Sequence, residues 1–98
     1  MDWTVIKEDS NVKAENTLTS EFRLTNTEIL FNGQFKVLKY LDPYGDTTFN
    51  IQMIKDLILD LEELKTNLPT DKNRIDEVIE LATSCINEPH TFLKFYRG

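Results

Sequence analysis

The sequence predicts an α+β fold, in which an antiparallel or mixed sheet of about four strands is covered on one face by an antiparallel helical hairpin. Two apolar stripes with the period of a helix lie close together in the second half of the chain, with only about five residues between them. Short β-prone runs precede and follow this pair. With 98 residues, of which 40% are hydrophobic, the chain is long enough for one core, so we expect a single compact domain over residues 1–98.

The first 41 residues of the chain predict three strands. Residues 3–7 are rich in β-prone side chains, whereas the polar stretch "EDSNVKAENTLTS" that follows predicts a loop. The dipeptide Asn32-Gly33 suits a tight hairpin turn, which predicts strands near Thr27–Phe31 and Gln34–Leu41. The latter run has apolar residues on both of its faces, as expected of a central strand.

Two helices follow. The first is predicted within "NIQMIKDLILDLEELKTNL" and the second within "NLPTDKNRIDEVIELATSCINEP", where Thr70 can cap the free amides and Asp71 suits the positive helix end. The apolar stripes are Ile54, Leu57, Ile58, Leu61 and Leu64 on the first helix, and Ile75, Val78, Ile79, Ala82, Cys85 and Ile86 on the second. The closing run "HTFLKFYR" predicts a strand with Leu93 and Phe95 on one face and Phe92, Lys94 and Tyr96 on the other.

The stretch "DPYGDTTFN" at residues 42–50 resembles a functional loop at first sight. Asp42, Tyr44 and Asp46 alternate as in a calcium loop, but tyrosine is a poor ligand and no glycine follows Asp46. A turn explains the stretch better: Pro43 and Gly45 set it, while Asp46 or a following threonine satisfies amides near the helix start. Phe49 is then expected to pack inward as the helix begins.

An enzyme is not predicted. His90, the one histidine, would have to meet Asp42 or Asp46 across the fold to form a catalytic base with an orienting carboxylate, and nothing in the sequence requires this. Three glycines cannot build a phosphate-binding loop, and Cys85 with one histidine provides no zinc ligand set. We therefore expect no metal and no cofactor.

Composition favours a cytoplasmic protein with a protein partner. Cys85 cannot form an internal disulfide, the N-terminus lacks a leader, and no run approaches the length of a membrane span. The net charge of −6 disfavours direct binding to nucleic acid. Residues 42–88 carry 11 acidic and four basic side chains, so this half would present a negative field to a basic partner.

Acidic side chains recur at helical spacing on both predicted helices. Like charges three or four residues apart repel by about a few tenths of a kcal/mol per pair in an isolated helix, and nearby lysines offset only part of this, which leaves room for a role beyond folding. A solvated acidic face that serves only solubility explains them equally well. The residues are Asp56, Asp60 and Glu63 on the first helix, and Asp76, Glu77 and Glu80 on the second.

Three stretches, "YLDPYGDTTFN", "DLILDLEEL" and "EPHTFLKFYRG", resemble a family of small acidic bacterial proteins that join a "DPYGDT-F-N" turn to a helix pair and end in a "PH-hydrophobic-L-F" strand. The resemblance covers residues 35–98. In size and charge such proteins are similar to immunity proteins of contact-dependent inhibition and related polymorphic toxin systems. This similarity implies that the chain binds a cognate toxin, which would be a basic protein of the nuclease type. The chain would block the functional surface of the toxin without chemistry of its own.

The leading hypothesis is therefore a toxin-binding immunity protein, and the alternative is a general interaction or structural module with no toxin partner. An exposed edge at the first or last strand could also pair with a partner strand or with a second copy of the chain, giving a homodimer. The predicted partner-binding residues are Tyr44, Asp46, Asp56, Asp60, Glu63, Asp76, Glu77 and Glu80.

Overall fold

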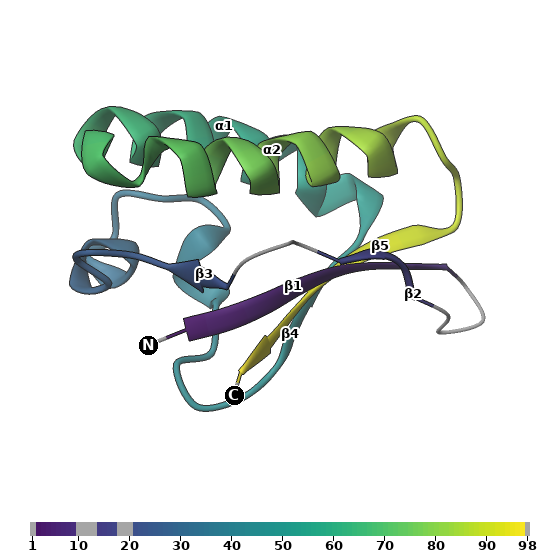
Figure 1. The fold of residues 1–98 in the computed structure, drawn as a ribbon, viewed down its shortest axis with the longest axis horizontal. Coiled ribbons are helices and arrows are strands. Elements are labelled where there is room, and N and C mark those ends of the chain that lie inside the picture. The colour runs from purple at the N-terminus through teal and green to yellow at the C-terminus, as the bar shows by residue number, and fades with distance from the viewer. Residues whose placement is uncertain (1, 10–13, 18–20, 98) are drawn as a thin grey trace.

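The computed structural model describes residues 2–9, 14–17 and 21–97, and it confirms the predicted α+β class. In this described part of the chain, five strands, two α-helices and three short 3-10 helices follow one another (Figure 1). They are β1 (Asp2–Asp9), β2 (Ala14–Thr17), β3 (Phe22–Arg23), η1 (Glu28–Phe31), η2 (Leu38–Tyr40), β4 (Thr47–Phe49), α1 (Ile51–Asn67), η3 (Pro69–Asp71), α2 (Lys72–Ile86) and β5 (Thr91–Arg97).

The sheet has the order β2-β1-β5-β4, and every pairing in it is antiparallel. β3 also pairs with β1, on the edge that β2 occupies, because β5 runs along the whole of the other edge from Trp3↔Arg97 to Asp9↔Thr91. The first and last strands are therefore the two central ones. The prediction of an exposed edge along either of them was wrong in this respect, since the outer strands are β2, β3 and β4.

The helical hairpin covers one face of this sheet, as predicted (Figure 1). Alternate side chains of the central strands, including Trp3, Val5 and Phe95, are fully buried beneath the helices. Phe95 makes edge-to-face contacts with the rings of Phe22 and Phe49, at centroid distances of 5.7 and 5.5 Å. The period-two prediction for the closing strand is confirmed, because Leu93 and Phe95 are buried and Phe92, Lys94 and Tyr96 are half-buried.

The predicted apolar stripe of α1 faces the core, with Ile54, Leu57, Leu61 and Leu64 buried and Ile58 partly buried. The helix begins at Asn50, whose side-chain oxygen accepts a hydrogen bond from the Met53 amide at 3.0 Å. Asp46 and the threonines do not cap it, contrary to prediction. They belong instead to β4 and the turn before it, and this three-residue strand was not predicted.

The start of α2 differs from the prediction. Thr70 lies within η3 and is exposed, and the helix starts after Asp71 without any side-chain cap. The buried Asp71 carboxylate points away from the helix and accepts hydrogen bonds from the amide and the hydroxyl of Thr25, at 2.9 and 3.0 Å. It therefore ties the segment after β3 to the helical hairpin. The apolar stripe itself is confirmed, with Ile75, Val78, Ala82 and Cys85 buried and Ile79 and Ile86 partly buried.

The predicted hairpin at residues 27–41 was wrong. Gly33 has the expected positive φ of 89°, but Asn32 has φ −85°, so the turn that needs two positive φ angles does not form. Two 3-10 helices replace the strands, with Phe35, Val37 and Leu38 buried between them or at their start. The loop predicted after residue 7 was also partly wrong, because β1 extends to Asp9 and β2 forms within it; residues 10–13 and 18–20 lie outside the described part.

Candidate functional site

The 42–46 stretch forms a compact turn that its own side chains hold together. The Asp42 carboxylate accepts a hydrogen bond from the Tyr44 amide at 2.8 Å, and the Asp42 amide donates to the Thr47 hydroxyl at 2.9 Å. A side chain at Gly45 would place its Cβ 2.8 Å from Oδ2 of Asp42, so only glycine leaves this carboxylate in place. The turn interpretation of the sequence is therefore correct for this loop.

Contacts with β1 and β5 then attach the loop to the end of the sheet. Nε1 of Trp3 donates to the carbonyl oxygen of Asp42 at 3.3 Å. From β5, the Arg97 guanidinium donates through Nε to the carbonyl oxygen of Pro43 at 2.7 Å, and the Arg97 amide donates to Oδ1 of Asp46 at 3.0 Å. Asp46 is therefore a loop anchor, although it is also exposed. Three separate attachments leave the loop little freedom relative to the sheet.

Tyr44 stands at the tip of this loop with 90% of its surface exposed. Its amide is fixed by Asp42, so the ring is presented from a defined backbone position. A second exposed aromatic side chain, Tyr40, lies four residues earlier at the end of η2. A tyrosine that a protein holds out into solvent on a rigid loop offers a partner a large contact area with little ordering cost.

Asp60 does not belong to an exposed acidic surface. Its side chain is turned inward with only 7% of the residue exposed. The carboxylate accepts hydrogen bonds from three consecutive amides, those of Lys36, Val37 and Leu38, at 3.2, 2.8 and 3.1 Å. It thereby caps the start of η2 from the neighbouring helix. The carboxylate therefore serves the fold, and the helical spacing of acidic residues could not distinguish this role.

The other two acidic residues predicted on α1 remain at the surface. Asp56 is half-exposed and lies 4.0 Å from the Lys36 ammonium, while the exposed Glu63 carboxylate accepts a hydrogen bond from the Gln34 amide group at 3.1 Å. Leu59 lies between them on the same exposed side of the helix. These carboxylates border the chain segment that leads into η2 and are accessible to a partner.

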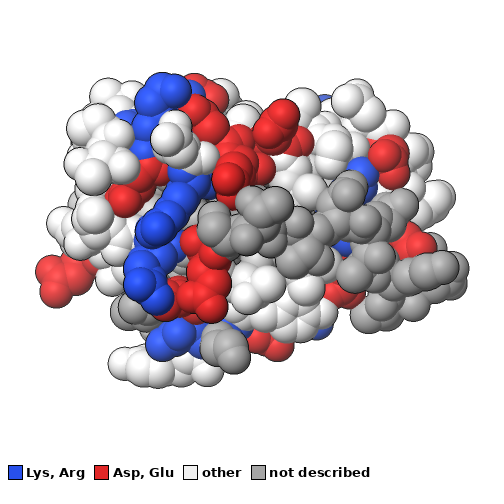
Figure 2. Space-filling model, viewed as in Figure 1, with Lys and Arg blue, Asp and Glu red and all other residues white. Residues whose placement is uncertain are grey.

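On α2 the acidic residues have different surroundings. Asp76 is bracketed by the ammonium groups of Lys65 and Lys72 at 2.8 and 3.0 Å, and its hydrogen bonds with Lys65 and then Lys72 hold the pKa of its carboxyl below the usual value. Glu77 is half-buried, whereas Glu80 is exposed. Figure 2 shows a band of Lys and Arg side chains down the left part of the viewed face with Asp and Glu side chains directly beside it. The two signs of charge are therefore interleaved on this face.

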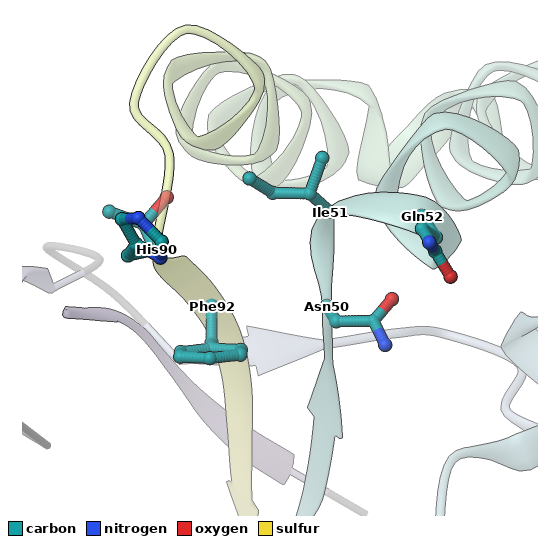
Figure 3. Close-up of a pocket in the computed structure, with 6 residues that line it drawn as sticks. Asn50, Ile51, Gln52, His90 and Phe92 are labelled. Atoms are coloured by element: carbon teal, nitrogen blue, oxygen red, sulfur yellow. The ribbon is translucent and has the colours of Figure 1, made fainter. Parts of the chain in front are cut away.

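His90 does not lie near Asp42 or Asp46, the two aspartates that could orient it as a catalytic base. Asp46 is bonded to Arg97 at the end of β5, whereas His90 precedes the first residue of that seven-residue strand. At about 3.3 Å per residue, roughly 20 Å of strand separates them. His90 instead lines a cleft of about 310 Å³ at the opposite end of β5, together with residues 50–52, Thr91 and Phe92 (Figure 3). No sequence motif predicted this cleft, because it arises where β4 and β5 separate.

Within residues 2–9, 14–17 and 21–97 there is no group of three or more His, Cys, Asp or Glu side chains that could hold a metal ion. Nor does any helix of that same part of the chain have the length and apolar character to cross a membrane. Comparisons of the chain with protein-family models, curated proteins and solved structures return no match. The resemblance to immunity proteins therefore stays a prediction.

Proposed function

We propose that this chain is an inhibitory binding protein that neutralises a cognate basic toxin domain by covering its functional surface. The exposure of Tyr44 supports this proposal most directly. This side chain is 90% exposed, on a loop that Trp3, Arg97 and Asp42 hold in place. Hot spots of protein interfaces are enriched in tyrosine, and prior rigidity lowers the entropy cost of binding. The loop does no chemistry in this role, since it supplies only contact area.

The negative charge of the chain increases the rate at which a basic partner approaches it. The net charge of −6 and the exposed carboxylates of Glu63 and Glu80 speed the encounter with a basic surface. Asp60 takes no part in this, because its carboxylate is buried and bonded to backbone amides. The partner-binding set that we propose is thus Tyr44, Asp46, Asp56, Glu63, Glu77 and Glu80, with Asp76 contributing less because two lysines already neutralise it.

A second candidate function is a general interaction module whose charges serve only solubility. The interleaving of the charges favours it: Lys65, Asp76 and Lys72 form an ion-paired chain between α1 and α2 that leaves little net field there. The two functions differ in their partner. A toxin encoded by a neighbouring reading frame supports the first, whereas a partner without toxicity supports the second.

The test couples affinity capture with protection. The full chain is immobilised, proteins bound from the producing cell are identified, and the product of any neighbouring reading frame is co-expressed with the chain. We expect a basic protein that arrests growth and is neutralised by the chain. Reversing Glu63 and Glu80 to lysine should slow association about tenfold or more at low salt, whereas the matched reversal of Glu21 and Glu28, which lie outside the two helices, should change it less. Equal association rates for both variants would contradict the proposed role of the helices.

A further inference from the structure

The outer face of α1 carries one large apolar side chain. Leu59 is 65% exposed, and among the described residues it is the only large apolar side chain on either α-helix that is exposed. The half-buried Ile58 borders the same face. The rest of the face, one and two helical turns to either side of Leu59, consists of polar side chains that are all exposed: Gln52, Lys55, Glu62, Glu63 and Thr66. A partner can therefore reach the whole length of this face.

Three of the acidic side chains of α1 already have partners within the chain. Asp56 lies 4.0 Å from the Lys36 ammonium, and Glu62 lies 3.4 Å from the Lys65 ammonium. Asp60 is buried and accepts hydrogen bonds from backbone amides. These carboxylates therefore add little uncompensated charge to the outer face of the helix.

Two charges of opposite sign on this face lack a counter-charge in the described chain. Lys55 takes part in no ion pair there, and the Glu63 carboxylate is bonded only to the neutral side-chain amide of Gln34, at 3.1 Å. Lys55 precedes Leu59 by four residues, and Glu63 follows it by four. At 1.5 Å per residue, each lies about 6 Å from Leu59 along the helix axis. The two free charges are thus placed symmetrically about the exposed apolar side chain.

We propose that this face binds a second copy of the chain, so that the α1 helices of two copies pack antiparallel about a two-fold axis at Leu59. Such an axis places each residue that precedes Leu59 in one copy beside the residue that follows Leu59 by the same number in the other. Lys55 of each copy then meets Glu63 of the other, which gives two ion pairs across the axis. A uniformly basic partner would instead attract Glu63 and repel Lys55, so the free charges of this face favour the same face in reverse.

The other residues of the face are compatible with the same axis. Gln52 precedes Leu59 by seven residues and Thr66 follows it by seven, so these neutral side chains meet and can form hydrogen bonds. Asp56 and Glu62 also meet, three residues from Leu59 on either side. Their like charges repel little, because each carboxylate already lies beside a lysine of its own chain. The two Leu59 side chains pack against each other at the centre, between the ion pairs.

The size of the face predicts a weak dimer. α1 has 17 residues and is therefore about 25 Å long, and one helix of this length buries less than the roughly 800 Å² per partner of a stable interface. The dimer should accordingly form only at high protein concentration. Figure 1 shows the loop before β4, which carries Tyr44, on the opposite side of the molecule from α1. The dimer leaves that loop free, so this inference does not rest on the proposed inhibition of a toxin.

Sedimentation equilibrium of the full chain at low salt provides the first test, over concentrations from about 10 µM to about 1 mM, which cover a weak association. The mean mass of the wild type should rise with concentration toward twice that of the monomer. Leu59→Lys places two ammonium groups on the axis and should weaken dimerisation about tenfold or more. Because Leu59 is exposed, this variant should keep the circular dichroism of the wild type. A wild type that stays monomeric throughout, or a Leu59→Lys variant that dimerises equally well, would overturn the proposal.

Charge reversal provides the second test, because it examines the pairing itself. Lys55→Glu and Glu63→Lys each turn both ion pairs into pairs of like charge, so each variant alone should dimerise about tenfold more weakly or worse. An equimolar mixture of the two variants should dimerise as well as the wild type, since opposite charges then face each other at both ends of the contact. Glu80→Lys, the same reversal at an exposed position of α2, is the control and should dimerise like the wild type. Single variants that dimerise like the control, or a mixture that does not recover, would refute the proposed surface.

Discussion

Replacement of Asp60 by alanine tests whether one buried carboxylate positions the segment that leads to the Tyr44 loop. Three amides donate to this carboxylate. Those of Val37 and Leu38 are buried and would lose the acceptor that Asp60 provides, while the Lys36 amide is partly accessible to water. An unsatisfied buried amide costs about 1–3 kcal/mol, so the two together predict a loss of about 3 kcal/mol in the free energy of unfolding. Asp60→Asn retains one acceptor oxygen and should cost about half as much.

Urea unfolding followed by fluorescence measures this loss. Trp3 is the only tryptophan and is fully buried, so its emission reports the folded state. At a slope of about 2 kcal/mol per molar urea, 3 kcal/mol lowers the midpoint by about 1.5 M. Asp56→Ala, one helical turn earlier and half-exposed, is the control and should change the stability by less than about 0.5 kcal/mol. If the two alanine variants unfold at the same urea concentration, Asp60 does not hold η2 as inferred.

Three further predictions concern the loop, the ion pairs of Asp76 and the hydrogen bond between Tyr96 and Glu8. Gly45→Ala should cost about 1 kcal/mol by displacing the Asp42 carboxylate, and less than half of that in an Asp42→Ala background, as a double-mutant cycle of urea midpoints would show. Because ion-paired lysines lower the pKa of Asp76, its stabilising contribution should be complete above its ordinary value of 3.8 and disappear as the pH falls through the lowered pKa; the urea midpoints of wild type and Asp76→Asn should therefore converge in acid. The hydrogen bond that Tyr96 donates to Glu8 raises the pKa of Tyr96 above its ordinary 10.0, so its contribution should be present below pH 10 and lost as the pH rises through the raised value. An absorbance titration of the folded chain should show one late-ionising tyrosine that is absent from Tyr96→Phe; its persistence there would contradict the assignment.

The parts of the fold that sequence predicted correctly are those specified by local periodicity. The stripe of α1 repeats every three or four residues, and the alternation of Leu93 and Phe95 with half-buried neighbours marks β5. Each pattern shows that one face of the element is buried. It does not show which neighbouring element covers that face. Hence element type and core side chains followed from sequence, whereas the strand order did not.

The structural predictions that were wrong concern residues whose conformation depends on contacts with distant parts of the chain. The segment before η2 has the composition of a strand, but a carboxylate from α1 satisfies its amides and stabilises a 3-10 turn instead. Likewise Asp71 was expected to act on its own helix and is bonded to Thr25, 46 residues away. Helical spacing alone could not separate the buried Asp60 from the exposed Glu63. For the Tyr44 loop, the sequence therefore predicted the turn but not the contacts that hold it, and the role of Tyr44 in binding stays a prediction.

The proposed function places the contact with an inhibited toxin on the fixed Tyr44 loop. The most direct measurement is a calorimetric titration of the co-purified partner with wild type and Tyr44→Ala, paired with growth of cells that express partner and chain together. Tyr44 is exposed, so its replacement should leave the urea midpoint unchanged. We predict that Tyr44→Ala weakens binding by more than tenfold and abolishes protection. Unaltered affinity and full protection by this variant would contradict the account.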